Sequence, residues 1–267
     1  MYLISIFLLV LILFIAQMQF KLLTPSTHKL RILEYHSVSS NGNENQIIIS
    51  KEKFKQQLDI LKREGYQTLW FSDLEKYKNK LPPKSVILTF DDGFLDNYTT
   101  VFPILKEYNF KATCFVVFGK IGKHMEWGGE FADNTEKMMS AKQLKAIGSH
   151  FELGYHSFKH DNYELLALEE IGKDIEKCKE VIEQEELQVY PVLAYTYGGY
   201  YRKKHKQQHA FFKVLKKNGI QIALRIGNRI NYYPFKNIFE IQRIDIRGYE
   251  SMEVFKKKLK YGRKKIF

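Results

Sequence analysis

Short apolar runs that predict β-strands alternate along this chain with longer segments in which apolar residues recur at helical spacing. Strand–helix alternation of this kind implies parallel strands joined by crossover helices. The predicted strands fall at 31–35, 66–69, 86–90, 112–118, 151–155, 192–196, 220–224 and 238–246. Seven or eight such units in 267 residues predict an α/β fold, a closed or nearly closed βα barrel that forms one domain.

The strand predicted at 86–90 is the most informative, because two aspartates and a glycine follow it directly. Adjacent carboxylates repel each other, so one is expected to have a raised pKa unless a cation neutralises the pair. A metal ion is the usual cation, and His156 and His160 offer it further ligands. Asp92, His156 and His160 together leave an open position for water, which is typical of catalytic metal sites. Two nitrogens and one oxygen suit one divalent ion, Zn²⁺ first, with Co²⁺ or Ni²⁺ as alternatives.

Reactive side chains follow several of the predicted strands. His36, the Asp91–Asp92 pair, His156 and Tyr197 each come just past a predicted strand end. In a parallel barrel these ends form one rim, where catalytic groups lie. Asp91 is therefore a candidate general base and His36 a candidate general acid. Taken singly, His36 would be interpreted as a core histidine bonded to the backbone, and two histidines four residues apart are often a surface feature.

The N-terminal segment is almost wholly apolar from Tyr2 to Ala16. As a helix it would span about 22 Å, short of the roughly 30 Å hydrocarbon core of a bilayer, and the next four residues would complete the span. It lacks the basic start and the small-residue cleavage site of a signal peptide. We expect residues 1–20 to form a membrane anchor or a signal segment, 21–30 a tether, and 31–267 one exported domain. Lys21, Lys29 and Arg31 follow the segment, and by the positive-inside rule they favour the opposite orientation, with the domain on the cytoplasmic side.

The formal net charge is +12, with 42 basic residues against 30 acidic ones. Charge alone is compatible with nucleic-acid binding, but no nucleic-acid motif accompanies it. We expect a solvated basic face, or one directed towards anionic lipid or wall polymer, and no nucleic-acid partner. The two cysteines, Cys114 and Cys178, lack the spacing of a zinc site and are interpreted as unpaired thiols, with a disulfide as the alternative.

Residues 89–93 (TFDDG) and 156–160 (HSFKH) closely resemble the first two motifs of the polysaccharide deacetylases, the NodB-type domain of carbohydrate esterase family four. The resemblance extends over about residues 31–250. It implies a distorted (β/α)7-type barrel that uses a divalent metal to hydrolyse N-acetyl, or sometimes O-acetyl, groups on glycans. The matching positions are Asp91 for the catalytic base and Asp92, His156 and His160 for the metal ligands.

The family's usual acid histidine lies in a Leu-x-His motif late in the domain, and no such motif follows Leu224. Residues 33–36 (LEYH) instead resemble the circularly permuted branch that deacetylates poly-β-1,6-N-acetylglucosamine in biofilm and exopolysaccharide systems. In that branch a Tyr-His pair near the start supplies the acid. The resemblance therefore implies that His36 is the acid and that an acetylated exopolysaccharide is the substrate.

The sequence departs from that branch at two points. Its third motif typically reads Tyr-Pro-Tyr-Gly, whereas residues 195–198 read Tyr-Thr-Tyr-Gly. Tyr197 matches the residue whose backbone N–H holds the oxyanion. Thr196 is therefore expected to influence that donor, whose loss would lower the rate roughly 10²–10³-fold. The arginine that orients the base in many members is missing from its motif, and Arg243 is a candidate substitute.

Two other functions fit the same residues. A catalytically degenerate glycan-binding protein would explain the departures, although a binder gains nothing from retaining ligands, base and acid. A phosphoesterase would normally add ligands for a second ion, and none is predicted on the rim. Among deacetylases, peptidoglycan and other acetylated glycans are alternative substrates. The stretch 119–134, which contains Trp127, is expected either to shape the glycan groove or to be a surface insertion.

Overall fold

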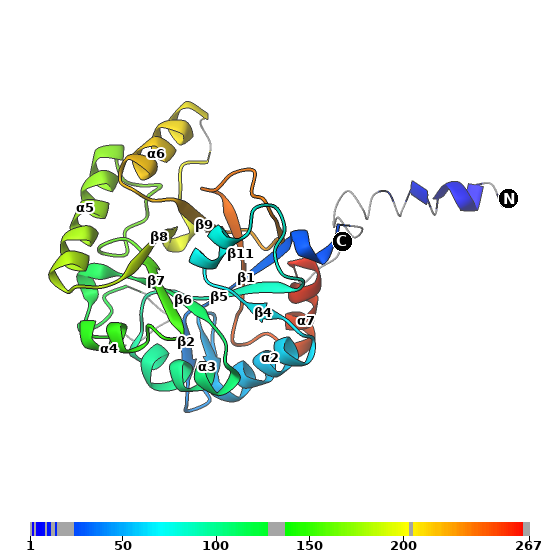
Figure 1. Cartoon of the computed structure of the whole chain (residues 1–267), viewed down its shortest axis with the longest axis horizontal. Coiled ribbons are helices and arrows are strands. Elements are labelled where there is room, and N and C mark those ends of the chain that lie inside the picture. Colours follow the sequence, from blue (N-terminus) through cyan, green and yellow to red (C-terminus); the bar gives the residue numbers. More distant parts are fainter. Residues whose placement is uncertain are drawn as a thin grey trace.

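The computed structural model describes residues 24–127, 137–202 and 205–263, together with positions 2, 4–8, 10, 11 and 14. Seven parallel strands form a closed ring with helices around it (Figure 1). In order around the ring these are β1 (Lys29–Tyr35), β5 (Ser85–Phe90), β6 (Ala112–Val116), β7 (Phe151–Tyr155), β8 (Val189–Ala194), β9 (Ile222–Ile226) and β11 (Ile241–Asp245). The predicted α/β barrel of the (β/α)7 type is confirmed.

Strand β1 closes the ring because it pairs with a barrel strand on each edge. It runs parallel to β5 along most of its length and to β11 at Leu33 and Glu34. Two short strands lie outside the ring: β4 (Gln67–Thr68) pairs with the start of β5, and β10 (Asn231–Tyr232) pairs antiparallel with the start of β1. The strand predicted at 66–69 is therefore peripheral, which leaves seven barrel strands rather than eight.

Six α-helices lie among the described residues outside the N-terminal segment. They are α2 (Lys51–Arg63), α3 (Phe102–Tyr108), α4 (Ala141–Ala146), α5 (Leu168–Gln184), α6 (His205–Lys217) and α7 (Met252–Tyr261). Serine caps begin three of them: the hydroxyl oxygens of Ser50, Ser140 and Ser251 each accept a backbone N–H from three residues on. Both cysteines are buried and unpaired, as interpreted from the sequence.

The chain between these elements differs from expectation near its start. Strand β1 begins at Lys29, so the last two residues of the predicted tether belong to the barrel. After His36, β2 (Ser37–Ser39) and β3 (Ile48–Ser50) form a small parallel sheet that the polar sequence there did not indicate. No helix among the described residues is both long enough and apolar enough to cross a bilayer. Positions 15–23 lie outside the described residues, so the anchor at 1–20 stays a prediction.

The barrel interior is layered. Its lower part is apolar and is built from β1, β5, β6, β8, β9 and β11 through Leu30, Ile32, Ile87, Phe115, Val192, Ala194, Leu224 and Ile241. Side chains alternate across a strand, so every second residue returns to the same face. Continuing along β1, β5 and β11 by two residues gives Glu34, Thr89 and Arg243, which are buried and polar. The strand pattern thus places a charged layer directly beneath the rim.

Candidate active site

A cavity of about 590 Å³ opens at the carboxyl ends of the barrel strands, and we call it the rim cavity. All six site residues predicted from the sequence line it: His36, Asp91, Asp92, His156, His160 and Tyr197. They follow β1, β5, β7 and β8, whose carboxyl ends meet because the strands are parallel. The structure therefore brings together every residue that the sequence placed at a strand end.

Asp92, His156 and His160 form a compact cluster in which one atom from each lies within 4.8 Å of the others. Asp92 Oδ1 is 3.4 Å from His156 Nε2 and 3.2 Å from His160 Nε2. His156 Nδ1 is 2.9 Å from the carbonyl of Ala194, which can only accept, so Nδ1 carries the proton and Nε2 presents a lone pair. Burial lowers the pKa of His156 to about 4, which favours the neutral imidazole that a metal requires.

Unpaired buried atoms support the presence of a cation here. Asp92 Oδ1 and His160 Nδ1 are buried, and neither has a hydrogen-bond partner of acceptable geometry within the described parts of the chain. A buried carboxylate oxygen without a partner is costly, and a cation beside it removes that cost. Two imidazoles and one carboxylate therefore fit a divalent ion with an open coordination position.

The turns that carry these residues have unusual backbone conformations. Of the eight non-glycine residues with positive φ in the described chain, four belong to these turns: Asp92 (73°), Ser157 (62°), His160 (67°) and Tyr197 (54°). Such conformations are uncommon for side-chain-bearing residues, cost of order 1–3 kcal/mol each, and cluster at functional sites. Here all four lie in the turns after β5, β7 and β8 that form the rim.

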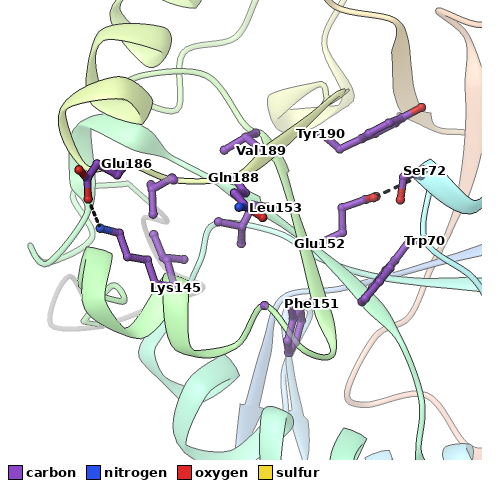
Figure 2. A pocket seen from close by; sticks show the side chains of 13 residues that line it. Trp70, Ser72, Lys145, Phe151, Glu152, Leu153, Glu186, Gln188, Val189 and Tyr190 are labelled. Atoms are coloured by element: carbon purple, nitrogen blue, oxygen red, sulfur yellow. Dashed lines mark hydrogen bonds and ion pairs between the residues drawn. The ribbon is translucent and has the colours of Figure 1, made fainter.

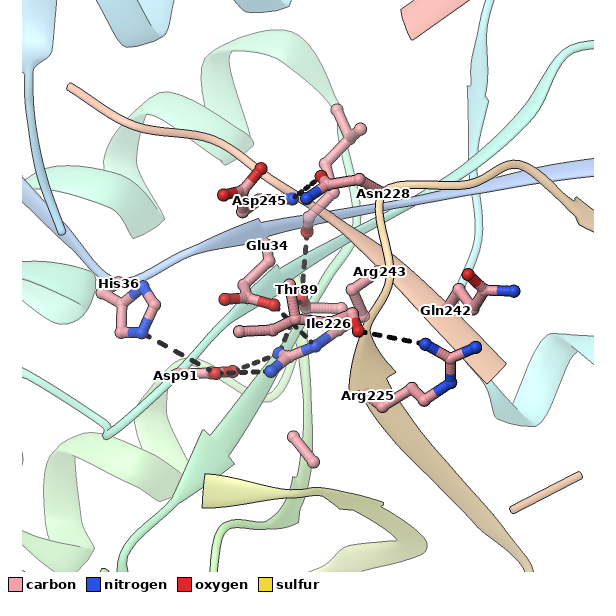
Figure 3. A network of polar contacts seen from close by, with 12 residues as sticks. Glu34, His36, Thr89, Asp91, Arg225, Ile226, Asn228, Gln242, Arg243 and Asp245 are labelled. Carbon is pink, nitrogen blue, oxygen red and sulfur yellow. Dashed lines mark hydrogen bonds and ion pairs between the residues drawn. The ribbon is translucent and has the colours of Figure 1, made fainter. Parts of the chain in front are cut away.

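Asp91 is held by a buried charge network beneath the cavity (Figure 3). Arg243 donates from Nη1 and Nη2 to the two carboxylate oxygens of Asp91 at 2.5 and 2.7 Å, and its Nε lies 3.0 Å from Glu34 Oε2. Burial by itself raises the pKa of Asp91, but Arg243 and the nearby histidines outweigh it and hold this pKa well below its ordinary value. Asp91 is therefore ionised and fixed in orientation, in the contact with Arg243 that the sequence suggested.

His36 stands at the edge of this network. Its Nε2 lies 3.9 Å from Asp91 Oδ2, and its side chain is partly exposed to the cavity. Glu34, His36 and Asp91 are close enough together to suggest a second metal cluster. Arg243 already supplies the positive charge between the two carboxylates, so these residues do not need a metal ion.

Aromatic rings enclose His160. The Trp127 ring stacks on it with centroids 4.3 Å apart and an interplanar angle of 12°, and the Tyr197 ring meets it edge-on at 4.5 Å. Trp127 and Tyr197 both line the rim cavity, and Tyr197 is 59% exposed. The part of the 119–134 stretch that the structure describes therefore contributes to the cavity wall, while residues 128–136 lie outside the described chain.

Two supporting residues were missed in the sequence. Glu34 is a charge among the apolar residues at the end of β1, Ile32, Leu33 and Tyr35, a signal that could have indicated a buried partner. Asp174 accepts the Phe158 N–H at 3.1 Å and the Tyr163 hydroxyl at 2.6 Å, and so holds the loop between His156 and Tyr163 from behind. It sits in the charged pattern of α5, where it resembles a solvated residue.

A second cavity, of about 580 Å³, lies near the starts of β7 and β8, at the other end of the barrel (Figure 2). Trp70, Tyr190 and Glu152 are among its lining residues. The Glu152 carboxylate accepts the backbone N–H groups of Phe71 and Ser72 at 2.9 and 3.2 Å. Neither metal-compatible cluster found among the described residues lies there, so the rim cavity is the candidate active site.

Comparisons with known proteins show which family this chain is related to. The family model described as polysaccharide deacetylase matches residues 78–223. YxkH of Bacillus subtilis, a candidate polysaccharide deacetylase, is 30% identical over 182 residues, which cover 66% of this chain and 60% of that protein. The match thus spans less than two thirds of that relative's length. The poly-β-1,6-N-acetyl-D-glucosamine N-deacetylase of Staphylococcus epidermidis is 28% identical over 240 residues, covering 79% of this chain and 77% of the relative.

Solved structures share the fold. The Streptococcus pyogenes deacetylase PplD, determined in complex with acetate, superposes with a TM-score of 0.70 at 24% identity, covering 88% of this chain and 99% of that one. IcaB from Ammonifex degensii gives a TM-score of 0.70 at 22% identity, covering 88% and 97%. At these identities the likeness establishes the barrel architecture.

Proposed function

This chain belongs to the polysaccharide deacetylase family, and from that premise we propose that it removes N-acetyl groups from an N-acetylglucosamine-containing exopolysaccharide and releases acetate. The observation that carries the proposal is the set of side chains that line the rim cavity. Three metal-compatible side chains, an ionised carboxylate and a histidine line it together. A glycan-binding protein would need none of this set, so the complete set favours an enzyme.

Asp92, His156 and His160 would hold one divalent ion, and their donor atoms suit Zn²⁺ best. Such an ion, when bound, polarises the acetamide carbonyl and lowers the pKa of a water molecule. His156 is prepared for this role, since its bond to the Ala194 carbonyl keeps Nε2 unprotonated.

Asp91 would act as the general base. Arg243 keeps it ionised and aligned, so that the carboxylate can accept a proton from the attacking water. The backbone N–H of Tyr197 would donate to the oxyanion that develops on the carbonyl oxygen. Protonated His36 would then give its proton to the departing sugar nitrogen as the carbon–nitrogen bond breaks, leaving acetate and an amine.

The β-1,6-linked polymer is the favoured substrate for two reasons. Relatives that match 70% or more of their length carry that substrate in their names. The candidate acid His36 also precedes the paired aspartates in this chain, as in the permuted branch that the residues 33–36 resemble. A polymer of this kind lies outside the cell, so we place the domain at the cell surface or in the periplasm, attached to the membrane through residues 1–20.

The test measures acetate release by the full chain from β-1,6-linked and β-1,4-linked N-acetylglucosamine oligomers, after metal loading and after chelation. We expect metal-dependent release that is faster from the β-1,6-linked oligomers. Release from β-1,4-linked oligomers alone would move the substrate to peptidoglycan or chitin-like glycans. No release from any oligomer by a chain with bound metal would reject the N-acetylglucosamine deacetylase and favour the glycan-binding alternative.

A further inference from the structure

The rim cavity depends on two loops from neighbouring strands. The loop after β7 runs from His156 to Ala167 and carries both candidate histidine ligands, and the turn after β8 carries Thr196 and Tyr197. The Thr196 hydroxyl donates to the backbone carbonyl of Asp161, the residue that follows His160. Thr196 is only 2% exposed, so this bond is shielded from water.

Asp161 is fixed from both sides. Its carbonyl receives the Thr196 hydroxyl, while its N–H donates to the Ser157 hydroxyl oxygen at 3.1 Å. The preceding residue, His160, has a φ of 67°. A side-chain-bearing residue keeps such a conformation only when its surroundings hold it there. The Thr196–Asp161 bond is one of the contacts that can do so.

The two loops pack tightly around this bond. The rings of His160 and Tyr197 are in contact, with centroids 4.5 Å apart. Gly199 approaches Asn162 so closely that a Cβ on Gly199 would lie 1.8 Å from the Asn162 side-chain oxygen. A small shift of one loop would therefore displace the other. The loop that carries His160 and the turn that carries Tyr197 are therefore expected to move together, and the Thr196 hydroxyl connects them.

We propose that Thr196 is a positioning residue whose hydroxyl joins the His160 loop to the Tyr197 turn, so that one hydrogen bond sets both a metal ligand and the oxyanion donor. The roles of His160 and Tyr197 rest on the proposed function. Thr196 stands where the Tyr-Pro-Tyr-Gly motif has proline. Because proline has no hydroxyl, threonine supplies a hydrogen bond between the loops that proline cannot make.

The test compares Thr196→Val, which keeps the shape and removes the hydroxyl, with Thr196→Ser, which keeps the hydroxyl. Metal affinity is measured by competition with a chromophoric chelator, and acetate release is measured separately. Loss of a group that orients a metal ligand typically weakens binding about 10–100-fold. We expect that loss, together with a lower kcat, for Thr196→Val, and wild-type affinity within a few-fold for Thr196→Ser.

Thr113→Val is the matched control. Thr113 is fully buried on β6, and its hydroxyl has no hydrogen-bond partner among the described residues. This variant should bind metal like the wild type. Thr196→Ala provides a second hydroxyl-free variant if the valine variant does not fold. Wild-type metal affinity in a folded hydroxyl-free variant, or equal loss in Thr196→Ser, would overturn the proposal. The affinity comparison decides this even if no glycan is deacetylated, so the two proposals can fail separately.

Discussion

Arg243 donates two parallel hydrogen bonds to the Asp91 carboxylate, at 2.5 and 2.7 Å, inside the barrel. Arg243 is fully buried and its third nitrogen faces Glu34, so one guanidinium binds two carboxylates, Glu34 on β1 and Asp91 just after β5. A bidentate pair fixes direction as well as charge. The candidate base is therefore oriented from below, which leaves its approach from the rim cavity open to water.

Arg243→Lys should lower acetate release at least tenfold while metal affinity stays near wild type. Lysine retains the charge but cannot make the bidentate contact, so Asp91 would lose its alignment. Acetate release and metal binding by the same preparation provide the measurement. Arg225→Lys on the adjacent strand β9 is the control, because Arg225 bonds only to the nearby Ile226 carbonyl among the contacts found for it. Equal activity in the two lysine variants would refute an orienting role.

His36→Ala should reduce acetate release by about 10²–10⁴-fold, the usual contribution of a general acid. Metal affinity should be unchanged, because His36 lies outside the cluster of Asp92, His156 and His160. Hydrolysis of an aryl acetate ester is the discriminating measurement, since its phenolate leaving group departs without protonation and should be less affected. Activity that survives His36→Ala on ordinary oligomers would assign the acid to another residue.

Asp174→Asn should change the pH dependence of stability. Burial raises the pKa of Asp174 from 3.8 to about 6 in the folded chain. Its stabilising contribution is thus complete below the unfolded pKa and is lost as pH rises through about 6. The asparagine variant cannot ionise, so the wild type should lose about 2–3 kcal/mol of unfolding free energy relative to it over this window.

Urea unfolding of the metal-free wild type and of Asp174→Asn, at several pH values from about 4 to about 7, tests this prediction. All other titrations are common to the two proteins and cancel in the difference. If the unfolding free energies of the two proteins changed in parallel with pH, the loop beside His160 would be insensitive to the charge on Asp174.

Trp127 should report metal binding by fluorescence. Its ring stacks on His160 at 4.3 Å, and the chain has only two tryptophans. In Trp70→Phe, Trp127 is the single tryptophan, and its emission under tryptophan-selective excitation should change as metal is added, saturating with the metal affinity measured by chelator competition. Trp127→Phe should show no such change. A silent Trp70→Phe variant that nonetheless binds metal would place Trp127 away from the bound ion.

Strand periodicity is why the barrel and its rim could be predicted. Apolar runs ending in Asp91, His156 or His36 encode both a buried strand and the reactive residue at its end. Parallel strands then bring those ends together without further information. The position of β4 outside the barrel could not be predicted in this way, because a two-residue strand and a full barrel strand begin with similar sequence.

The supporting contacts were out of reach for a different reason. The partners Glu34 and Arg243 are distant in sequence and meet only because β1 and β11 are adjacent in the ring. Thr196 was expected only to influence the position of the oxyanion donor, whereas the structure gives its hydroxyl a partner in the next loop. The positive φ of His160 and Tyr197 is likewise imposed by the packing of those loops.

The central claim is that Asp91 is the base beside a metal held by Asp92, His156 and His160. The most direct measurement is acetate release by Asp91→Asn from β-1,6-linked N-acetylglucosamine oligomers, with bound metal quantified in the same sample. We predict wild-type metal content and no turnover, whereas Asp92→Asn should lose the metal as well. An Asp91→Asn variant that binds metal and keeps more than a few per cent of wild-type activity would contradict the account.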